Sequence, residues 1–378
     1  MKRLILLFTF VLSFFVFAVP AFAADQISYA SQPDEVVVFL NNIAYARDTI
    51  ALPGGVDVAV ALPDQIFQDT LVLREDGERV PTYRINRNDG RIMLRWQSAT
   101  DSEVREVTLE YLLSGLSWTP KYDMWLGDDE AETVELDFFA EITNSVLALD
   151  EVDIRLVAGR VDTSQQLDAV STVTVNQYIA GYDRSGAGMA PTITGAASIQ
   201  HIYTLDDTIN AVPGDVVYVN MQESTLPARR VHLWNAQTDD QVTVIYKVRN
   251  ESELPFAEGI VRSYQNGLFI GSDFVELTPI GGEGSITVGN LQDVRVSRAE
   301  TRTAISGPYE RDTQHDTVLT LTNFTGGSAD IDIVDWYPAE ALDFQFSLEP
   351  ERQGGNIFRW EITLEAGETR TIMYQFKS

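Results

Sequence analysis

Apolar and polar residues alternate with a period of two through most of this chain. In the stretch 134–142, the even-numbered residues are Val, Leu, Phe, Ala and Ile, whereas Glu135, Asp137 and Glu141 occupy odd positions. Side chains of a β-strand point alternately to opposite faces, so this pattern is typical of strands with one buried face. The pattern predicts an all-β fold of two to three antiparallel β-sandwich-like domains. The same alternation recurs at 56–62, 107–113, 242–248, 358–364 and 372–376.

Glycine-containing turn signals separate several of the predicted strands. Asn88-Asp89-Gly90 and Asn266-Gly267 are typical of tight β-hairpins. Glu365-Ala366-Gly367-Glu368 separates the last two predicted strands, and Val212-Pro213-Gly214-Asp215 separates two earlier ones. The sequence therefore predicts a hairpin at each of these four turns.

Breaks in the alternation predict the domain organisation. They divide the chain into an N-terminal β domain (24–114), a middle β domain (115–230) and a C-terminal β-sandwich domain (231–378). Residues 162–199 are rich in Ser, Thr, Gly and Ala, and the alternation fades there, so we expect them to form a mobile insertion in the middle domain. No fixed-period repeat is visible in the sequence.

The N-terminus, residues 1–23, carries the features of a Sec-type signal peptide. Lys2 and Arg3 precede a short apolar run, and an Ala-x-Ala tripeptide ends at Ala23. This order of charge, apolar core and small residues predicts cleavage between Ala23 and Ala24. No later apolar stretch is long enough for a membrane helix, so we expect no membrane insertion after cleavage. The predicted location is periplasmic or extracellular.

Composition limits the partners and the chemistry. Asp and Glu number 56 against 27 Lys and Arg, which gives a formal net charge of −29. Such a chain repels phosphates, and it carries no basic stripe, so we expect no nucleic-acid partner. The chain contains no cysteine, which excludes disulfides, thiol catalysis and a lipid-anchored cysteine.

No catalytic or cofactor motif is found. The serine-elbow and phosphate-loop patterns are absent from the sequence. His201, His232 and His315 are scattered, and none has a partner at the spacing of a metal site. Asn250 and Asn323 each begin an N-x-S/T tripeptide, which matters only in a host that glycosylates. We therefore expect no catalytic residue, cofactor or metal ligand from the sequence.

The aromatic residues Trp118, Tyr122 and Trp125 form the sharpest local cluster. If their side chains are exposed, they could stack on sugar rings or contact a partner protein. If they are buried, they pack between the sheets of a sandwich, which is the commoner place for aromatic residues and the favoured interpretation.

The segment Gly115-Leu116-Ser117-Trp118-Thr119-Pro120-Lys121-Tyr122-Asp123 resembles a signature of the domain-of-unknown-function 4139 family, also called mucoidy-inhibitor-like. Further similar segments follow in order at 140–144, 152–159, 258–271, 320–323 and 360–374. The resemblance covers roughly residues 115 to 376. It implies a β-rich extracytoplasmic or envelope protein and supplies no catalytic residue. Longer members carry a coiled-coil insertion, for which this chain has no heptad run.

Two hypotheses about function follow. The first is a non-enzymatic β-sandwich protein with a binding or structural role in the cell envelope, where its partner is an envelope protein or a polysaccharide. The alternative is an extracytoplasmic hydrolase that acts on polysaccharide or peptide with carboxylate or metal chemistry. A pocket in which two carboxylates, or a histidine and carboxylates, converge would favour the alternative.

Overall fold

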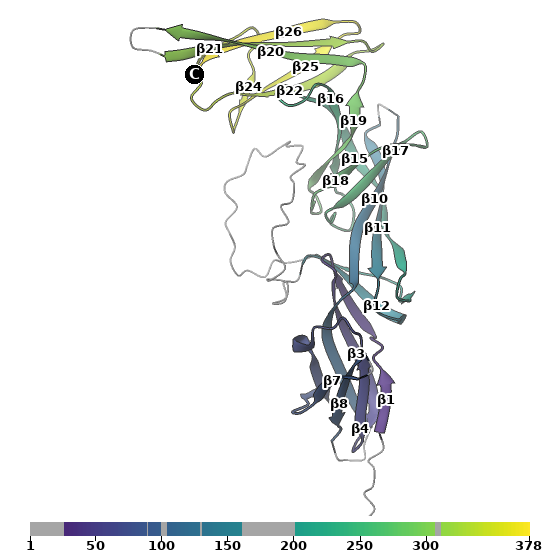
Figure 1. Ribbon diagram of the computed structural model, residues 1–378. Helices are drawn as coiled ribbons and strands as arrows, with labels where there is room; N and C mark the ends of the chain where they lie inside the picture. Colours follow the sequence, from purple (N-terminus) through teal and green to yellow (C-terminus); the bar gives the residue numbers. More distant parts are fainter. Residues whose placement is uncertain (1–25, 89, 100–103, 129–130, 161–200, 307–310) are drawn as a thin grey trace, which may run out of the picture. The chain divides into compact units, whose positions relative to one another are not determined.

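The computed structural model describes residues 26–88, 90–99, 104–128, 131–160, 201–306 and 311–378 (Figure 1). The predicted signal peptide with Ala23 and Ala24, and the predicted insertion 162–199, lie outside the described residues. The described part is nearly all β-strand, which confirms the all-β fold class. In this part of the chain, no helix is both long enough and apolar enough to span a membrane.

The chain divides into two compact units, whose boundaries cut across the strand order. The N-terminal unit contains residues 1–33 and 47–111, and the large unit contains 34–46 and 112–378. Strands β3 and β9 are divided between the two units. The three predicted domains and their boundaries stay a prediction.

The N-terminal unit contains a four-stranded sheet and part of an eight-stranded sheet. One has the strand order β1-β4-β8-β7, and the other includes neighbouring strands β3, β9, β5 and β6. The predicted strand at 56–62 is confirmed as β4, whose Val58, Val60 and Leu62 are buried. The elements are β1 (Gln26–Ala30), β3 (Ile43–Pro53), β4 (Asp57–Leu62), the 3-10 helix η1 (Gln68–Thr70), β5 (Val72–Glu75), β6 (Glu78–Arg79), β7 (Arg84–Asn88), β8 (Arg91–Gln97) and β9 (Val104–Ser114).

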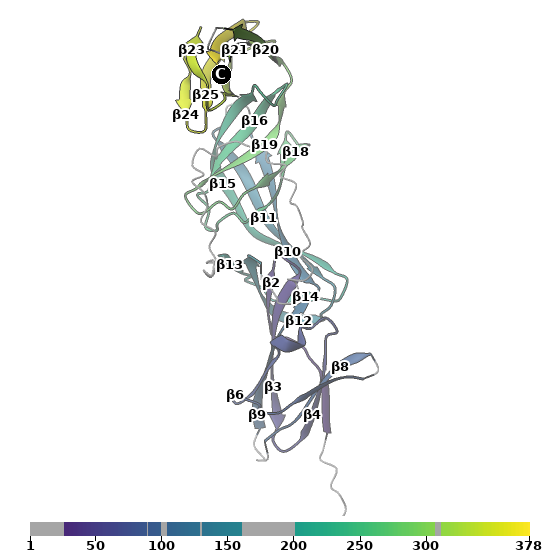
Figure 2. The same cartoon turned by 60° about the vertical axis from the view of Figure 1, so that its left-hand side comes forward.

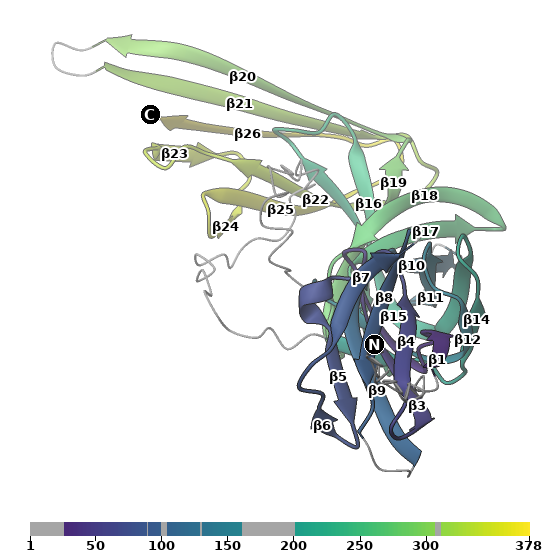
Figure 3. The same ribbon diagram turned by 60° about the horizontal axis from the view of Figure 1, so that its bottom comes forward.

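The large unit is built around a ten-stranded sheet. Its main path is β18-β17-β10-β11-β15-β22-β25-β24, with β16 paired to β15 and β19 paired to β16 (Figure 2). A four-stranded sheet, β20-β21-β26-β23, contains three long strands that lie side by side (Figure 3). The strands are β2 (Glu35–Phe39), β10 (Leu116–Leu126), β11 (Thr133–Asn144), β12 (Leu149–Ala158), β13 (His201–Thr204), β14 (Ile209–Ala211), β15 (Val216–Asn235), β16 (Val242–Arg249), β17 (Gly259–Gln265), β18 (Leu268–Val275), β19 (Glu283–Leu291), β20 (Val294–Ser306), β21 (Arg311–Asn323), β22 (Ala329–Trp336), β23 (Leu342–Phe346), β24 (Glu351–Gln353), β25 (Ile357–Leu364) and β26 (Thr369–Lys377).

Three of the four described sheets are mixed, because distant parts of the chain pair in parallel. Strand β17 lies parallel to β10, and β22 lies parallel to β15. Parallel neighbours cannot be joined by a tight turn, so these pairs need long connections. The predicted antiparallel pairs therefore form only part of the sheet network.

Two of the four predicted hairpins are confirmed and two are wrong. Strands β7 and β8 pair, as do β17 and β18, where Asn266 and Gly267 both have positive φ angles of 53° and 75°. Strand β25 does not pair with β26 across residues 365–368, because they belong to different sheets. The turn at 212–215 likewise leads into β15, which pairs with β11, whereas β13 pairs with β12. Both turns carry the chain from one sheet to another.

The turn at 365–368 is held by a buried asparagine from a neighbouring strand. The Asn323 backbone N–H donates to the Glu368 carbonyl at 2.9 Å, and the Gly367 N–H donates to the Asn323 carbonyl at 2.9 Å. The Asn323 side chain donates to the carbonyls of Gly327 at 2.8 Å and Leu364 at 3.1 Å. This set of bonds satisfies the polar groups of a fully buried residue.

The same arrangement occurs twice more in the large unit. Gly214 donates to the Asn144 carbonyl at 2.8 Å, and Gly281 donates to the Asn250 carbonyl at 2.7 Å. In each case the glycine lies two residues before a strand that pairs antiparallel with the strand carrying or preceding the asparagine. The three turns form a structural repeat, and it has no fixed period because the connections differ in length. The asparagine side chains of the N-x-S/T tripeptides at Asn250 and Asn323 are therefore buried parts of these turns.

Candidate functional site

Strand β10 separates the predicted aromatic cluster onto two faces. Trp118 and Tyr122 are 1% and 0% exposed, whereas Trp125 is 40% exposed. The Trp118 indole N–H donates to the Val157 carbonyl at 3.0 Å, and the Tyr122 hydroxyl donates to the Ala257 carbonyl at 2.9 Å. Trp118 and Tyr122 are thus core residues with satisfied polar groups. Trp125 alone of the three can contribute to a surface.

Trp125 belongs to an exposed strip of aromatic side chains. It stacks on Tyr264 of β17 with ring centroids 4.5 Å apart and an interplanar angle of 21°. Tyr264 meets Phe269 of β18 edge-on at 5.8 Å. Phe269 is 58% exposed, and the cross-strand pair Ile260 and Phe274 is also exposed. We call the outward-facing side chains of β11, β10, β17 and β18 the outer face.

Two ion pairs cross the outer face beside the strip. Arg262 of β17 binds the Asp123 carboxylate of β10 with two bonds of 2.7 Å and 2.8 Å. Lys121 bonds to Glu141 of β11, and that bond lowers the pKa of the Glu141 carboxyl. Bidentate Arg–carboxylate geometry fixes both partners in orientation as well as position. These ion pairs hold the region of the face next to Trp125 in a defined arrangement.

A group of carboxylates lies on the other side of Trp125. The Trp125 indole N–H donates to the Asp137 carboxylate at 3.2 Å. The pKa of the Asp137 carboxyl is raised, mainly by burial. The hydrogen bond from Trp125 acts in the opposite direction, whereas repulsion from the carboxylates of Glu223, Asp123 and Glu135 raises the pKa further. Carboxylates on this face outnumber the cations of Arg262 and Lys121, so the face carries a negative potential.

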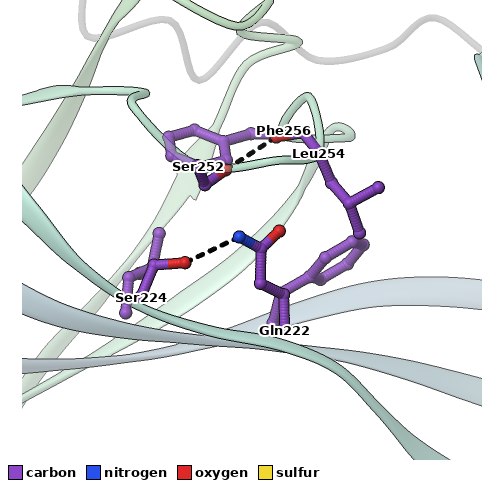
Figure 4. A pocket seen from close by; sticks show the side chains of 7 residues that line it. Gln222, Ser224, Ser252, Leu254 and Phe256 are labelled. Carbon is purple, nitrogen blue, oxygen red and sulfur yellow. Dashed lines mark hydrogen bonds between the residues drawn. The ribbon is translucent and has the colours of Figure 1, made fainter.

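A small cavity in the large unit is too small for a ligand (Figure 4). Its volume is about 10 Å³, room for no more than a single water molecule. Its polar side chains are already bonded, Gln222 to the Ser224 hydroxyl at 2.9 Å and Ser252 to the Leu254 carbonyl at 2.8 Å. The remaining walls are the apolar residues Leu136, Phe138 and Phe256.

A second cavity, of about 480 Å³, is within the size range of small-molecule sites. It is formed by β10, β17 and β18 together with β15, β16 and β19, and all of these strands belong to the large unit. No carboxylate occurs among the described residues that line it, so the acid pair of the hydrolase hypothesis is not found there. The lining residues are Leu126, Arg230, Val244, Tyr246, Gln265, Ile270, Val288, Gly289, Asn290, Leu291 and Gln292.

A buried charge network lies in the C-terminal part of the large unit. The Asp335 carboxylate is fully buried and accepts bonds from the Tyr374 hydroxyl at 2.6 Å and from Arg298 Nε at 2.9 Å. Burial raises the pKa of Asp335, and Arg298 and Tyr374 oppose that shift. Arg298 also bonds to Glu300 at 2.9 Å. Because these groups satisfy one another inside the core, we assign them to stability.

His315 connects this network to the chain end. One ring nitrogen lies 2.9 Å from a Glu300 oxygen, and the other lies 2.9 Å from the Ser378 hydroxyl. The order serine, histidine, acid resembles a nucleophile with its base, but neither cavity described above is lined by these residues. Among the described residues, no three His, Cys, Asp or Glu side chains are grouped to hold a metal ion.

Sequence reasoning missed Tyr264, Phe269 and Arg230 as surface or cavity residues. Tyr264 and Phe269 flank the Asn266-Gly267 turn, and an aromatic residue on each arm of a hairpin is a readable signal for a cross-strand contact. The contact of Tyr264 with Trp125 depends on the parallel β10–β17 pair, which joins segments far apart in the sequence. No local pattern identifies that pairing.

A family model described as a domain of unknown function, DUF4139, matches residues 107–378. No curated protein and no solved structure matches the chain. The matched region includes every strand of the outer face and of the larger cavity.

Proposed function

This chain belongs to the DUF4139 family, and from that premise we propose that it is an exported, non-enzymatic protein that binds a protein partner in the cell envelope through its outer face. Export is proposed from the N-terminal charge, apolar core and Ala-x-Ala pattern. Binding is proposed from one observation, the exposed aromatic strip of Trp125, Tyr264 and Phe269. Exposed aromatic residues that lie beside a fixed arginine are typical of the centres of protein interfaces.

The ring geometry favours a protein over a polysaccharide as the occupant. Sugar rings stack on an aromatic face that is open to solvent. Trp125 and Tyr264 are stacked on one another, so each ring has one face covered, and Tyr264 also meets the edge of Phe269. A protein partner needs no free ring face and gains from the neighbouring apolar side chains Ile260 and Phe274.

The carboxylates of the outer face favour a partner that carries positive charge. The carboxylates around Trp125 repel one another enough to raise the pKa of Asp137 together with burial. A partner with Lys or Arg side chains relieves that repulsion, and its association is weakened by salt because the charges are close to solvent. We therefore infer a partner surface that combines basic and apolar side chains.

Site-specific photo-crosslinking in the producing cell tests the proposal. A photoreactive benzoylphenylalanine at Phe269 is compared with one at Met373, an exposed residue of β26. We expect a discrete protein adduct at position 269 that disappears when Trp125→Ala is added and weakens with the double change Glu135→Gln, Asp137→Asn. Equal adducts at 269 and 373, or adducts insensitive to Trp125→Ala, would contradict the proposal. Retention on an immobilised envelope polysaccharide that depends on Trp125 would favour the sugar alternative instead.

A further inference from the structure

We propose that strand β20 pairs antiparallel with β20 of a second copy of this chain, around a two-fold axis at Ala299. Strand β20 ends the four-stranded sheet, and β21 is its only paired neighbour in the described part of the chain (Figure 3). The outer face belongs to the ten-stranded sheet. The proposed dimer therefore does not involve the surface proposed for the envelope partner.

Length and regularity distinguish β20 from the other sheet edges. Its 13 residues pair with β21 without a register shift, and residues 301–304 are all exposed. The other described strands with a single paired neighbour contain five residues or fewer, apart from β18 and β19. These two lie against one another, since the Thr287 N–H of β19 donates to the Asp273 carboxylate of β18. A long, regular and exposed edge is a template for another strand.

The even-numbered residues of β20 direct their backbone groups away from β21. The Phe324 N–H donates to the Asp293 carbonyl at 2.8 Å, so this opposed pair just before β20 is a hydrogen-bonded one. On the other side of β21, Thr313 and Ser378 exchange two backbone bonds of 2.9 and 3.0 Å. Hydrogen-bonded and non-hydrogen-bonded pairs alternate along an antiparallel ladder. The N–H and C=O groups of the even-numbered residues 294–304 therefore face outward and can bond to another strand.

The charges of β20 favour a second copy as the occupant. With Ala299 at the axis, Arg298 of each copy lies opposite Glu300 of the other copy, so four charges alternate in sign. An axis at Arg298 or at Glu300 instead places like charges directly opposite, which is destabilising. Arg298 and Glu300 keep the bond of 2.9 Å that they form within one copy, because the dimer brings a second such pair beside the first. The edge is therefore complementary to itself in charge.

Small side chains on the opposite face of β20 allow the two strands to approach. Ala299 is exposed, and at the axis it would face its own copy in a non-hydrogen-bonded pair, where the strands are closest. The exposed Ser297 and Thr301 would lie opposite one another on both sides of the axis. Hydroxyl side chains in such cross-strand pairs form hydrogen bonds. Each copy contributes four strands, so the pairing produces a continuous sheet of eight.

Cysteine crosslinking of the purified protein tests the register. The chain contains no cysteine, so each variant carries a single thiol. On mild oxidation, Ala299→Cys should form a disulfide-linked dimer, because facing residues of a non-hydrogen-bonded pair lie within reach of a disulfide. In Thr301→Cys and Thr303→Cys the two thiols are more than about 13 Å apart along the strands, so we expect several-fold less dimer. Equal or greater crosslinking at Thr301 or Thr303 would overturn the proposal.

Sedimentation velocity measures the association without a crosslink. We expect a monomer–dimer equilibrium with a dissociation constant on the order of 10 μM, as for other small interfaces. Ala299→Lys places two like charges at the axis and should weaken the dimer about tenfold or more. Met373→Lys is the matched control, because Met373 is exposed in the same row of the same sheet face, two strands from the edge. It should leave the dissociation constant unchanged.

A second variant keeps the test decisive if Ala299→Lys disturbs the fold. Ala304→Pro removes an N–H that faces outward and spares the bonds to β21, so it should also weaken the dimer while the circular dichroism spectrum is unchanged. The proposal is overturned if the wild type stays monomeric up to about 200 μM, or if Ala299→Lys and Met373→Lys have equal effects. Crosslinking at Phe269 is unaffected by these outcomes, so the two proposals fail separately.

Discussion

Arg298 and Arg359 lie in the same unit and bind carboxylates at different depths. Arg298 bonds to the buried Asp335 carboxylate at 2.9 Å and to Glu300 at 2.9 Å. Arg359 bonds to the half-exposed Asp332 carboxylate at 2.7 Å. The contrast shows that losing a carboxylate from a buried pair leaves a charge alone in the core, whereas water can replace a lost partner in a half-exposed pair.

Asp335→Ala gives the largest expected effect on this comparison. It removes the main partner of Arg298 and of the Tyr374 hydroxyl inside the core, so we expect a loss of about 3–5 kcal/mol in the free energy of unfolding. Urea denaturation followed by circular dichroism measures this loss.

Asp332→Ala on the same strand is the control for Asp335→Ala. Asp332 pairs with Arg359 at 2.7 Å in a half-exposed position, so its removal should cost about 1 kcal/mol or less. Similar losses for Asp332→Ala and Asp335→Ala would show that burial does not distinguish the two sites.

Acid should lower the free energy of unfolding through protonation of Glu300, which belongs to the network of Arg298. Burial opposes ionisation of Glu300, but His315, Arg302 and Arg298 outweigh it and lower the pKa of Glu300 to about 2. A lowered carboxyl pKa contributes stability above the unfolded value of about 4.5, and that stability is lost as the pH falls from there towards about 2. Glu300→Gln should remove up to about 3 kcal/mol of this acid-dependent stability.

The measurement is the free energy of unfolding between pH 7 and pH 2.5 for the wild type and for Glu300→Gln. Glu361→Gln, at an exposed position beside Arg359, controls for the loss of one negative charge. If the wild type and Glu300→Gln lose stability in parallel as the pH falls, Glu300 is not the source of acid sensitivity.

The repeated asparagine turn predicts a smaller loss of stability, which should be equal at Asn250 and at Asn323. Asn250→Ala removes a buried side chain that donates to two carbonyls at 3.1 Å, and Asn323→Ala removes one that donates to three carbonyls at 2.8, 3.1 and 3.2 Å. We expect each to cost about 2 kcal/mol, since buried carbonyls lose their donors. Thermal unfolding compares the two variants. If the two variants lose very different amounts of stability, the turns share a geometry but do not contribute equally to stability.

Trp125→Ala should have the smallest effect on stability. The side chain is 40% exposed and packs mainly on Tyr264, so we expect a loss of about 1 kcal/mol or less. Trp118→Ala removes a buried indole from the same strand and should cost about 3–5 kcal/mol. If the two changes cost the same, Trp125 is a core residue and the outer face loses its main anchor.

The strand pattern of the large unit could be predicted because it depends on local alternation. Val134, Leu136 and Phe138 are buried, as their positions predict. The same rule separates Trp125 from Trp118 and Tyr122, since an odd-numbered position of β10 faces away from the even-numbered ones. The odd-numbered position of Trp125 therefore indicates which of the three aromatic residues reaches the surface.

The cavity could not be predicted from the same rule. It depends on Ile270 and Val288, the extra residues at two bulges, where alternation breaks without a signal in the sequence. The Arg298–Asp335 pair depends on contacts between separate strands whose partners no local pattern specifies. The prediction of a hairpin at 365–368 was wrong for a related reason, because a turn sequence does not indicate which sheet the next strand joins.

The parallel β10–β17 pair has a consequence for how the protein folds during synthesis. Arg262 binds Asp123 across 139 residues of chain, so β10 emerges from the ribosome long before the neighbour that completes its edge. Pairing at such sequence separation is slow, and an unpaired apolar edge invites aggregation while it waits. Chains truncated before Gly259 should therefore be trapped by chaperones or lost as aggregates. The synthesis of β17, more than the rate at which local hairpins form, therefore determines when this edge of the large unit is protected from aggregation.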